Sequence, residues 1–310
     1  MSTAPTARLT RVKAIAEARG QIDERMYSKP GVVGSMIGAK IRGGVIQPTV
    51  GLTFFVREKA SKTDLSPKER VPARIRIGNL SIATDVLEWP QMREQSWAGP
   101  TIIDDGHSQG SMTCFGHTDA GAFGISCAHC LVGKDGRPAT PTNVDFYSNS
   151  NPGWNPAGES VFLAYSSGRG LSGDYGFLDC GLFDLQDDSL RARALNGRRI
   201  DVVTDLHSLL HTRLIGASTL NVPGYDMRRE CKVVGVESFA FGERSDLALL
   251  VDPPGTYQGD SGMLWLTADG RAAAVHARGE GRAGNIASFK TASMSAARVC
   301  TYLGAQLYIG

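Results

Sequence analysis

The chain has 310 residues, of which 42% are hydrophobic and 21% are charged, a composition typical of globular proteins. Its net charge of +2 is too small to predict binding to nucleic acid or to an anionic membrane. No apolar run approaches the ~18 residues that a membrane-spanning helix needs. We therefore expect no nucleic-acid partner and no membrane partner.

Residues 1–28 are predicted to form an N-terminal helical segment. Leu9, Val12 and Ile15 recur at helical spacing, and Gly20 is a candidate for the end of the helix. The segment lacks the apolar core of a signal peptide, which predicts a cytoplasmic protein. In that compartment the six cysteines are expected to be thiols.

Residues 29–92 are predicted to form a small α/β accessory module. Strands are expected around residues 32–41 and 51–57, followed by a short helix that begins at Ser66 and then by further strands. The glycines before Lys40 are not followed by the Ser or Thr of a phosphate-binding loop, so we expect close backbone packing here and not nucleotide binding.

Residues 93–310 are predicted to form the second, larger domain. A polar linker at its start leads into many short apolar runs separated by Gly, Pro, Asn and Asp, a pattern typical of antiparallel barrels or sandwiches. We expect two barrels, at roughly 100–195 and 200–290, and then a C-terminal helix that follows Thr291.

The stretch "YQGDSGM" contains Ser261, a candidate nucleophile that needs a neighbouring base. His129 in "GISCAHCL" follows an apolar strand and is the best candidate for that base. Asp179 in "YGFLDCGLFDL" lies inside an apolar strand, where a buried carboxylate requires a partner. Asp174 and Asp184 lie at more turn-like positions and are weaker candidates for the acid.

These three motifs resemble those of the trypsin/chymotrypsin-like serine peptidase family. "SCAHC", "DCGLF" and "GDSG" occur in the family's order. The N-terminal module, with its G-V-V-G, "SPKERVP" and "DVLEW" segments, resembles the non-secreted bacterial members of the family. The resemblance implies a mainly β fold: a chymotrypsin-like double antiparallel β-barrel with a C-terminal helix, preceded by a small α/β module.

The resemblance also implies an activity and a set of catalytic residues. His129 would take the proton of Ser261 as it attacks a peptide carbonyl, and Asp179 would orient the imidazole. The backbone N–H groups of Gly259 and Ser261 would form the oxyanion hole, with a positive φ at Gly259. The expected protein is a hydrolase, a trypsin-like serine endopeptidase that acts on protein or peptide substrates and needs no cofactor and no metal.

The resemblance further suggests a substrate preference. Gly255 stands six residues before Ser261, where trypsin has the aspartate that selects Lys and Arg, so this preference is not expected. His276, followed by Arg278 and Gly279, lies on the strand expected to line the specificity pocket. It resembles the pocket histidine of glutamyl endopeptidases and of picornaviral chymotrypsin-like proteases. We therefore expect Glu, Asp or Gln before the cleaved bond.

Three features depart from the family pattern or are left open by it. The sequence has no nearby Ile-Val-Gly-Gly start whose freed amine could pair with Asp260. Either another group pairs with Asp260, or activation depends on cleavage or on a protein partner, for which the N-terminal module is the expected docking surface. Met263 stands where most relatives have Gly or Ser. Cys114 and Cys130 have the 16-residue spacing of the family's cysteine pair beside the catalytic histidine, but their oxidation state is left open.

Two alternatives stay open at the sequence level. The first is a catalytically silent protein-interaction module on the same fold. The second is a zinc site built from a Cys/His cluster. Its candidate ligands are Cys114, His117, Cys127, His129 and Cys130.

Overall fold

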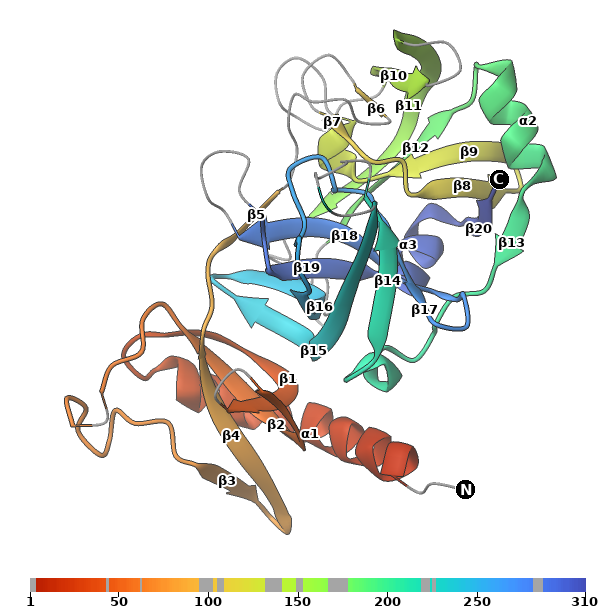
Figure 1. The fold of residues 1–310 in the computed structure, drawn as a ribbon. Helices are drawn as coiled ribbons and strands as arrows, with labels where there is room; N and C mark the ends of the chain where they lie inside the picture. The colour runs from red at the N-terminus through yellow and green to blue at the C-terminus, as the bar shows by residue number, and fades with distance from the viewer. Residues whose placement is uncertain are drawn as a thin grey trace.

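The computed structural model describes most of the chain (Figure 1). The described residues are 4–42, 45–61, 63–94, 103–104, 109–131, 141–148, 153–166, 178–218, 224, 227–280 and 287–310. Most of the predicted linker, residues 95–102 and 105–108, lies outside them.

The N-terminal module consists of one long helix and a four-stranded mixed sheet. Its elements are α1 (Ala4–Tyr27), β1 (Val32–Arg42), β2 (Val45–Val56), β3 (Arg74–Ile77) and β4 (Leu80–Glu88). The buried positions Val12, Ile15, Ile22 and Met26 lie on the side of α1 that packs against the sheet and the second barrel.

Two local expectations in this module were wrong. The helix does not end at Gly20 but continues to Tyr27, because the residues after the glycine still present apolar side chains to the core. The predicted helix at Ser66 is a single turn. The Glu69 side chain accepts a hydrogen bond from the Ser66 N–H, as in a helix capping box, but Pro72 follows too soon for a helix to continue.

The second barrel is closed by six antiparallel strands. They are β14 (Arg213–Ala217), β15 (Arg228–Ala240), β16 (Glu243–Val251), β17 (Leu264–Thr267), β18 (Ala272–Glu280) and β19 (Lys290–Ser295). The strand order is β14-β17-β18-β19-β16-β15, and β14 also pairs with β15. A short added strand, β5 (Met92–Glu94), pairs with β18.

The first barrel is a nine-stranded sheet in which the strands β8, β9, β12, β11 and β10 are neighbours in that order. Its strands are β6 (Ile103–Asp104), β7 (Gln109–Gly110), β8 (Cys114–Thr118), β9 (Gly121–Ser126), β10 (Asn143–Ser148), β11 (Gly153–Ser166), β12 (Leu178–Asp184), β13 (Arg198–Ile200) and β20 (Gln306–Ile309). The helices η1 (Ala128–Cys130), α2 (Asp188–Asn196) and α3 (Ala296–Leu303) pack with it, whereas η2 (Leu206–Leu209) packs with α1 and the second barrel.

The C-terminal helix is present but begins later than predicted. Thr291 belongs to β19, and α3 starts at Ala296 with Val299 and Leu303 buried on its inner face. The chain then forms β20, which returns to the first barrel and pairs with β8 and β13. Of residues 200–206, only Ile200 at the end of β13 and Val202 in an isolated bridge take part in strand pairing.

The structure therefore has the predicted fold class: a chymotrypsin-like double antiparallel β-barrel with a C-terminal helix and a small α/β N-terminal module (Figure 1). The module is not separated from the barrels, because β1 pairs with β15 and makes one eleven-stranded sheet of the module and the second barrel. The boundary between residues 92 and 93 stays a prediction. Among the described residues, no helix is both long and apolar enough to cross a membrane.

Candidate functional site

His129 and Asp179 form a buried pair in the first barrel. His129 lies on η1, directly after β9, and Asp179 lies on β12, which pairs with β9. The His129 backbone N–H donates to Asp179 Oδ1 at 2.9 Å, and the ring N–H at Nδ1 donates to Asp179 Oδ2. The aspartate is fully buried and the histidine is 5% exposed. Both carboxylate oxygens therefore fix one orientation of the imidazole.

This pairing leaves the other ring nitrogen available as a base. His129 Nε2 is buried and has no hydrogen-bond partner in the part of the chain that the structure describes. Burial alone would lower the pKa of His129, but the charge of Asp179 and its hydrogen bond, together with Cys130, raise this pKa well above its usual value. Asp179 thus favours proton uptake at His129.

Ser261 lies in the second barrel, in the tight turn before β17. Its hydroxyl donates to the Ala277 carbonyl of β18 at 3.1 Å, and the side chain is fully buried. Gly259 and Gly262 on either side have φ values of +96°, a conformation that residues with a side chain rarely adopt. The positive φ predicted at Gly259 is confirmed, whereas its oxyanion role stays a prediction.

The two barrels meet at the residues around Ser261 and His129. Cys127, two residues before His129, donates from its thiol to the His276 carbonyl at 3.3 Å, and the Gly262 N–H donates to the same carbonyl at 2.9 Å. His276 is also close enough to His129 for their charges to interact. The candidate nucleophile and base are therefore brought to one buried junction.

Sequence reasoning missed two residues that hold the nucleophile turn. The Ser111 N–H donates to the Ser261 carbonyl at 2.7 Å, and Ser111 Oγ donates to the Gly259 carbonyl at 2.9 Å. A Cβ on Gly262 would lie 1.9 Å from the Ser111 carbonyl oxygen, so this glycine is required by packing as well as by φ. Nothing in the local sequence marks Ser111, because its partners are about 150 residues away.

Cys130, directly after the candidate base, packs against Gly110. A Cβ on Gly110 would lie 2.3 Å from Cys130 Sγ, so this glycine packs directly on the cysteine after the candidate base. Cys114 lies near Cys300 and receives a backbone hydrogen bond from Tyr308. All six cysteines are free thiols in the structure, including Cys114 and Cys130, whose oxidation state the sequence left open.

Asp260 is held by groups from within the chain. Ser218 Oγ donates to Asp260 Oδ1, the Tyr257 N–H donates to Oδ2 at 2.9 Å, and Arg229 supplies a nearby positive charge. Burial raises the pKa of Asp260 to about 6, against the lowering effect of these three groups. The carboxylate beside the nucleophile therefore has partners without a new N-terminal amine.

The predicted pocket residues lie along β18 and in the loop before Ser261. Gly255 has a φ of +85° and lies against Ser288, to which its neighbour Thr256 is bridged. His276 is fully buried, with its ring edge-on to Trp265 in the second barrel. Burial, with a smaller contribution from His129, lowers the pKa of His276 to about 3, so its imidazole is neutral near pH 7.

Arg278 does not offer a free charge to this region. Its guanidinium forms an ion pair with Glu243 of β16 and is almost entirely buried. Gly279 follows it, opposite β5. The positive charge of Arg278 is thus balanced within the fold.

Met263 packs into the core of the second barrel and is 2% exposed. Its sulfur lies beside Gly216, and a Cβ added at Gly216 would lie 3.0 Å from this sulfur. The side chain therefore points into the barrel interior, beside the turn of Ser261.

The residues of the alternative zinc site are divided in the described part of the structure. Cys127, His129 and Asp179 have donor atoms within 4.8 Å of one another, but His129 Nδ1 already donates to Asp179. His117 stacks on Tyr308 and contacts the Ala194 carbonyl. Structural zinc usually takes four ligands, and the proposed set does not converge. Asp174, a weaker candidate for the acid, lies outside the described residues.

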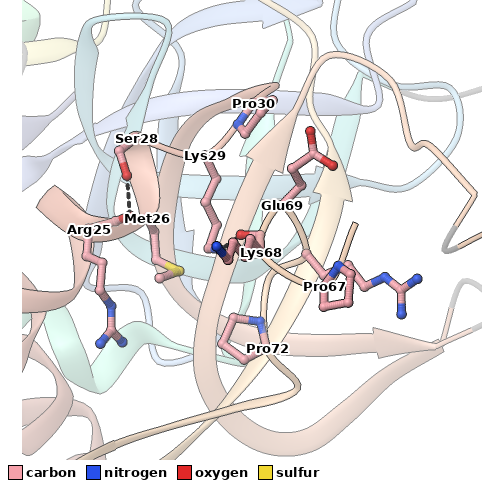
Figure 2. A pocket seen from close by; sticks show the side chains of 10 residues that line it. Arg25, Met26, Ser28, Lys29, Pro30, Pro67, Lys68, Glu69 and Pro72 are labelled. Atoms are coloured by element: carbon pink, nitrogen blue, oxygen red, sulfur yellow. Dashed lines mark hydrogen bonds between the residues drawn. The ribbon is translucent and has the colours of Figure 1, made fainter. Parts of the chain in front are cut away.

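A cavity of about 480 Å³ lies in the N-terminal module (Figure 2). It lies between the end of α1 and the turn at residues 67–72, and its lining is rich in basic residues. The lining residues are Arg25, Met26, Ser28, Lys29, Pro30, Pro67, Lys68, Glu69, Arg70 and Pro72. Lys29 donates to the Lys68 carbonyl and Ser28 to the Arg25 carbonyl, so part of its polar lining is used internally. None of the residues around Ser261 contributes to it.

No protein-family model matches this sequence, and no curated protein matches it. Several solved structures are similar in fold. Protease A from Thermobifida fusca has 17% identity and a TM-score of 0.41, over 68% of this chain and 98% of that chain. The MamO protease domain from Magnetospirillum magneticum, in its apo form, has 13% identity and a TM-score of 0.34, over 66% and 95%. A Glu endopeptidase in complex with MPD has 16% identity and a TM-score of 0.36, over 67% and 90%. Likenesses of this size do not assign an activity.

Proposed function

We propose that this protein is a serine endopeptidase that uses Ser261 as nucleophile, His129 as general base and Asp179 to orient the base. The observation that carries the proposal is the buried His129–Asp179 pair, which leaves His129 Nε2 without a partner among the described residues at the junction that also holds Ser261. A hydroxyl is a poor nucleophile alone, and a base at this junction would activate it.

The reaction would follow from these positions. As Ser261 Oγ attacks a peptide carbonyl, His129 Nε2 takes the hydroxyl proton and later gives it to the leaving amine, so that water can hydrolyse the acyl-enzyme. The N–H groups of Gly259 and Ser261 would stabilise the oxyanion, with an effect on the order of 3 kcal/mol for each donor. The positive φ of Gly259 supports this role.

The same geometry narrows the expected substrate. His276 is neutral, and the charge of Arg278 is balanced by Glu243. A neutral imidazole donates a hydrogen bond, and a substrate carboxylate bound beside it would itself raise the pKa of His276. We therefore propose Glu, Asp or Gln before the cut. An activating protein that docks on the N-terminal module stays a prediction from the sequence.

A fluorophosphonate probe tests the proposed activity directly. The wild-type protein should form an adduct at Ser261, the Ser261→Ala variant should form none, and Asp179→Asn should slow labelling by about 10⁴-fold. Because His129 must be neutral to act as base and its pKa is raised, the labelling rate should fall as the pH drops through a value above 6.5. A folded protein with no Ser261 adduct at any pH would favour the catalytically silent interaction module.

A further inference from the structure

One edge of β18 is occupied by three different segments in succession. At its start, β17 pairs with Ala272, Ala274 and Val275. In the middle, the turn of Ser261 lies against the same edge. The His276 N–H donates to the Met263 carbonyl, and the Ala277 carbonyl accepts from Ser261 Oγ. After the nucleophile, β5 pairs with residues 278–280. The backbone groups of residues 278–280 therefore form a docking edge directly beside Ser261.

The direction of β5 matters for its function. The pairing is antiparallel, with Met92 opposite Glu280, Arg93 opposite Gly279 and Glu94 opposite Arg278. Since Ala277 precedes Arg278 and carries the hydrogen bond from Ser261, β5 runs along the edge toward the nucleophile. An extended peptide added to this edge in the same direction would carry its next residues to Ser261.

β5 follows closely after Trp89, a residue that is firmly packed in the N-terminal module. Trp89, just after β4, is 2% exposed and stacks on Phe55 with ring centroids 4.9 Å apart. Its N–H donates to the Val56 carbonyl at 3.1 Å, and Lys290 of β19 lies over its ring at 5.9 Å. Only two residues separate this anchor from β5, and so short a connection gives a local concentration in the millimolar range or higher.

The chain also returns to the nucleophile after β5. Gly110 lies against the Ser261 carbonyl and Cys130, and Ser111 bonds the turn itself. Two described parts of the chain between the module and the first barrel thus touch the site: β5 on β18, and residues 110–111 on the nucleophile turn.

We propose that β5 is an intramolecular inhibitor: it occupies the backbone edge of β18 at residues 278–280 and competes there with an extended peptide on its way to Ser261. The inference rests on the proposed function for its catalytic consequence, which is self-inhibition: a substrate reaches Ser261 in register only when β5 leaves the edge. The ligand class is an extended peptide recognised through its backbone.

A binding experiment tests the competition without any need for catalysis. In a Ser261→Ala background, the double variant Arg93→Pro/Glu94→Pro removes the backbone N–H of β5 that faces β18, whichever of the two residues provides it. The probe is a fluorescein-labelled peptide with the sequence of residues 89–94, measured by fluorescence anisotropy. The proline variant should bind it at least 10-fold more tightly than the parent.

The matched control is Arg93→Ala/Glu94→Ala, which changes the same side chains but keeps both N–H groups. It should bind the peptide as weakly as the parent, and a scrambled peptide should bind to none of the proteins. If the proline variant does not fold, Met92→Gly/Arg93→Ser/Glu94→Gly weakens the same strand through flexibility. Equal peptide affinity in folded parent and β5 variants would overturn the proposal.

A second readout separates this proposal from the proposed function. With Ser261 restored, the proline variant should hydrolyse an extended peptide substrate with a KM at least 10-fold lower than wild type, at an unchanged rate of fluorophosphonate labelling. Normal labelling with identical KM values would overturn the role of β5 alone. Tighter peptide binding in the proline variant without any Ser261 adduct would support the docking edge and reject the peptidase.

Discussion

The second barrel accepts two added strands, and the two are built very differently. β1 pairs with β15 and joins the N-terminal module to the barrel, whereas β5 pairs with β18 beside Ser261. Both additions are antiparallel and use backbone groups. The first, however, has a long run of buried side chains, from Gly34 to Ala39, and the second is a three-residue strand. Both strands are added through backbone pairing, and they differ in their length and in the buried run that only β1 is shown to have.

The β1 junction is stabilised by a buried ionic network. Arg19 of α1 bonds Asp23 at 2.6 Å and the Ser35 carbonyl at 2.9 Å, and it also donates to the Glu237 carbonyl of β15. His207 bonds the Glu237 carboxylate at 2.6 Å. Helix, module strand and barrel strand are thus tied together by one fully buried guanidinium.

The largest effect is expected when this guanidinium is removed. Arg19→Met removes the cation that pairs with the partly buried Asp23 carboxylate and leaves Glu237 with His207 as its partner. The free energy of unfolding should fall by about 3–5 kcal/mol. Chemical denaturation measures the loss. Binding of the labelled β5 peptide to β18 should not change, because the two strand additions lie on different strands. A matching change in peptide affinity would show that the two additions are coupled.

Two buried groups at the nucleophile end of the second barrel, His276 and Asp260, should make the stability of the protein depend on pH in opposite ways. The pKa of His276 is lowered to about 3, so between about pH 6.5 and 3 the unfolded chain binds a proton that the folded protein does not, and stability falls as the pH falls. The pKa of Asp260 is raised to about 6, so between about pH 6 and 4 the folded protein holds the extra proton and stability rises as the pH falls.

Two substitutions should therefore change, in opposite directions, how steeply the free energy of unfolding falls as the pH drops from 7 to 4. Asp260→Asn should make the loss of stability on acidification steeper, by on the order of 3 kcal/mol in total, and His276→Gln should make it shallower. Urea denaturation at pH 7, 6, 5 and 4 measures both. Changes of the same sign in the two variants would contradict these assignments.

The smallest effects are expected from a matched pair of glycine substitutions in the module. Gly34 of β1 faces β15 so closely that a Cβ would lie 1.9 Å from the Phe239 carbonyl oxygen, whereas a Cβ on Gly20 of α1 meets nothing within 4 Å. Gly34→Ala should cost about 1–3 kcal/mol by forcing the strands apart. Gly20→Ala should stabilise by about 0.5–1 kcal/mol, because alanine favours the helix. A thermal-unfolding comparison in which both variants shift in the same direction would contradict the close approach of β1 and β15.

Local sequence patterns predicted the elements whose residues interact with near neighbours. The apolar runs that became β12, β15, β16 and β18 were found because each strand buries both or most of its faces. The helix expected at Ser66 was wrong, since the capping contact formed but Pro72 prevented propagation. Helix ends were also misjudged, because α1 and α3 take their bounds from the surfaces on which they pack.

In the candidate site, too, the residues that lie in short motifs were predicted, and the residues that reach the site only through the fold were missed. His129, Asp179 and Ser261 each lie in a short motif, and a carboxylate within an apolar strand already indicates a partner. Gly110 and Ser111 carry no motif, yet they contact Cys130, Gly259 and the Ser261 carbonyl. The spacing of Cys114 and Cys130 along the sequence gave no indication that Gly110 packs on Cys130, which only the path of the chain across the barrel shows.

By itself, the sequence determined a mainly β protein with a preceding α/β module, the motif residues of a candidate hydrolytic site and the need for glycine at 259, since these follow from apolar periodicity, buried charge and local backbone geometry. The tertiary structure decided which distant groups meet. It gave Asp260 its partners Ser218 and Arg229, paired Arg278 with Glu243, and added β5 to the edge of β18 beside Ser261. Strand addition uses backbone groups that every residue has, so no side-chain pattern in residues 92–94 indicates where that strand binds.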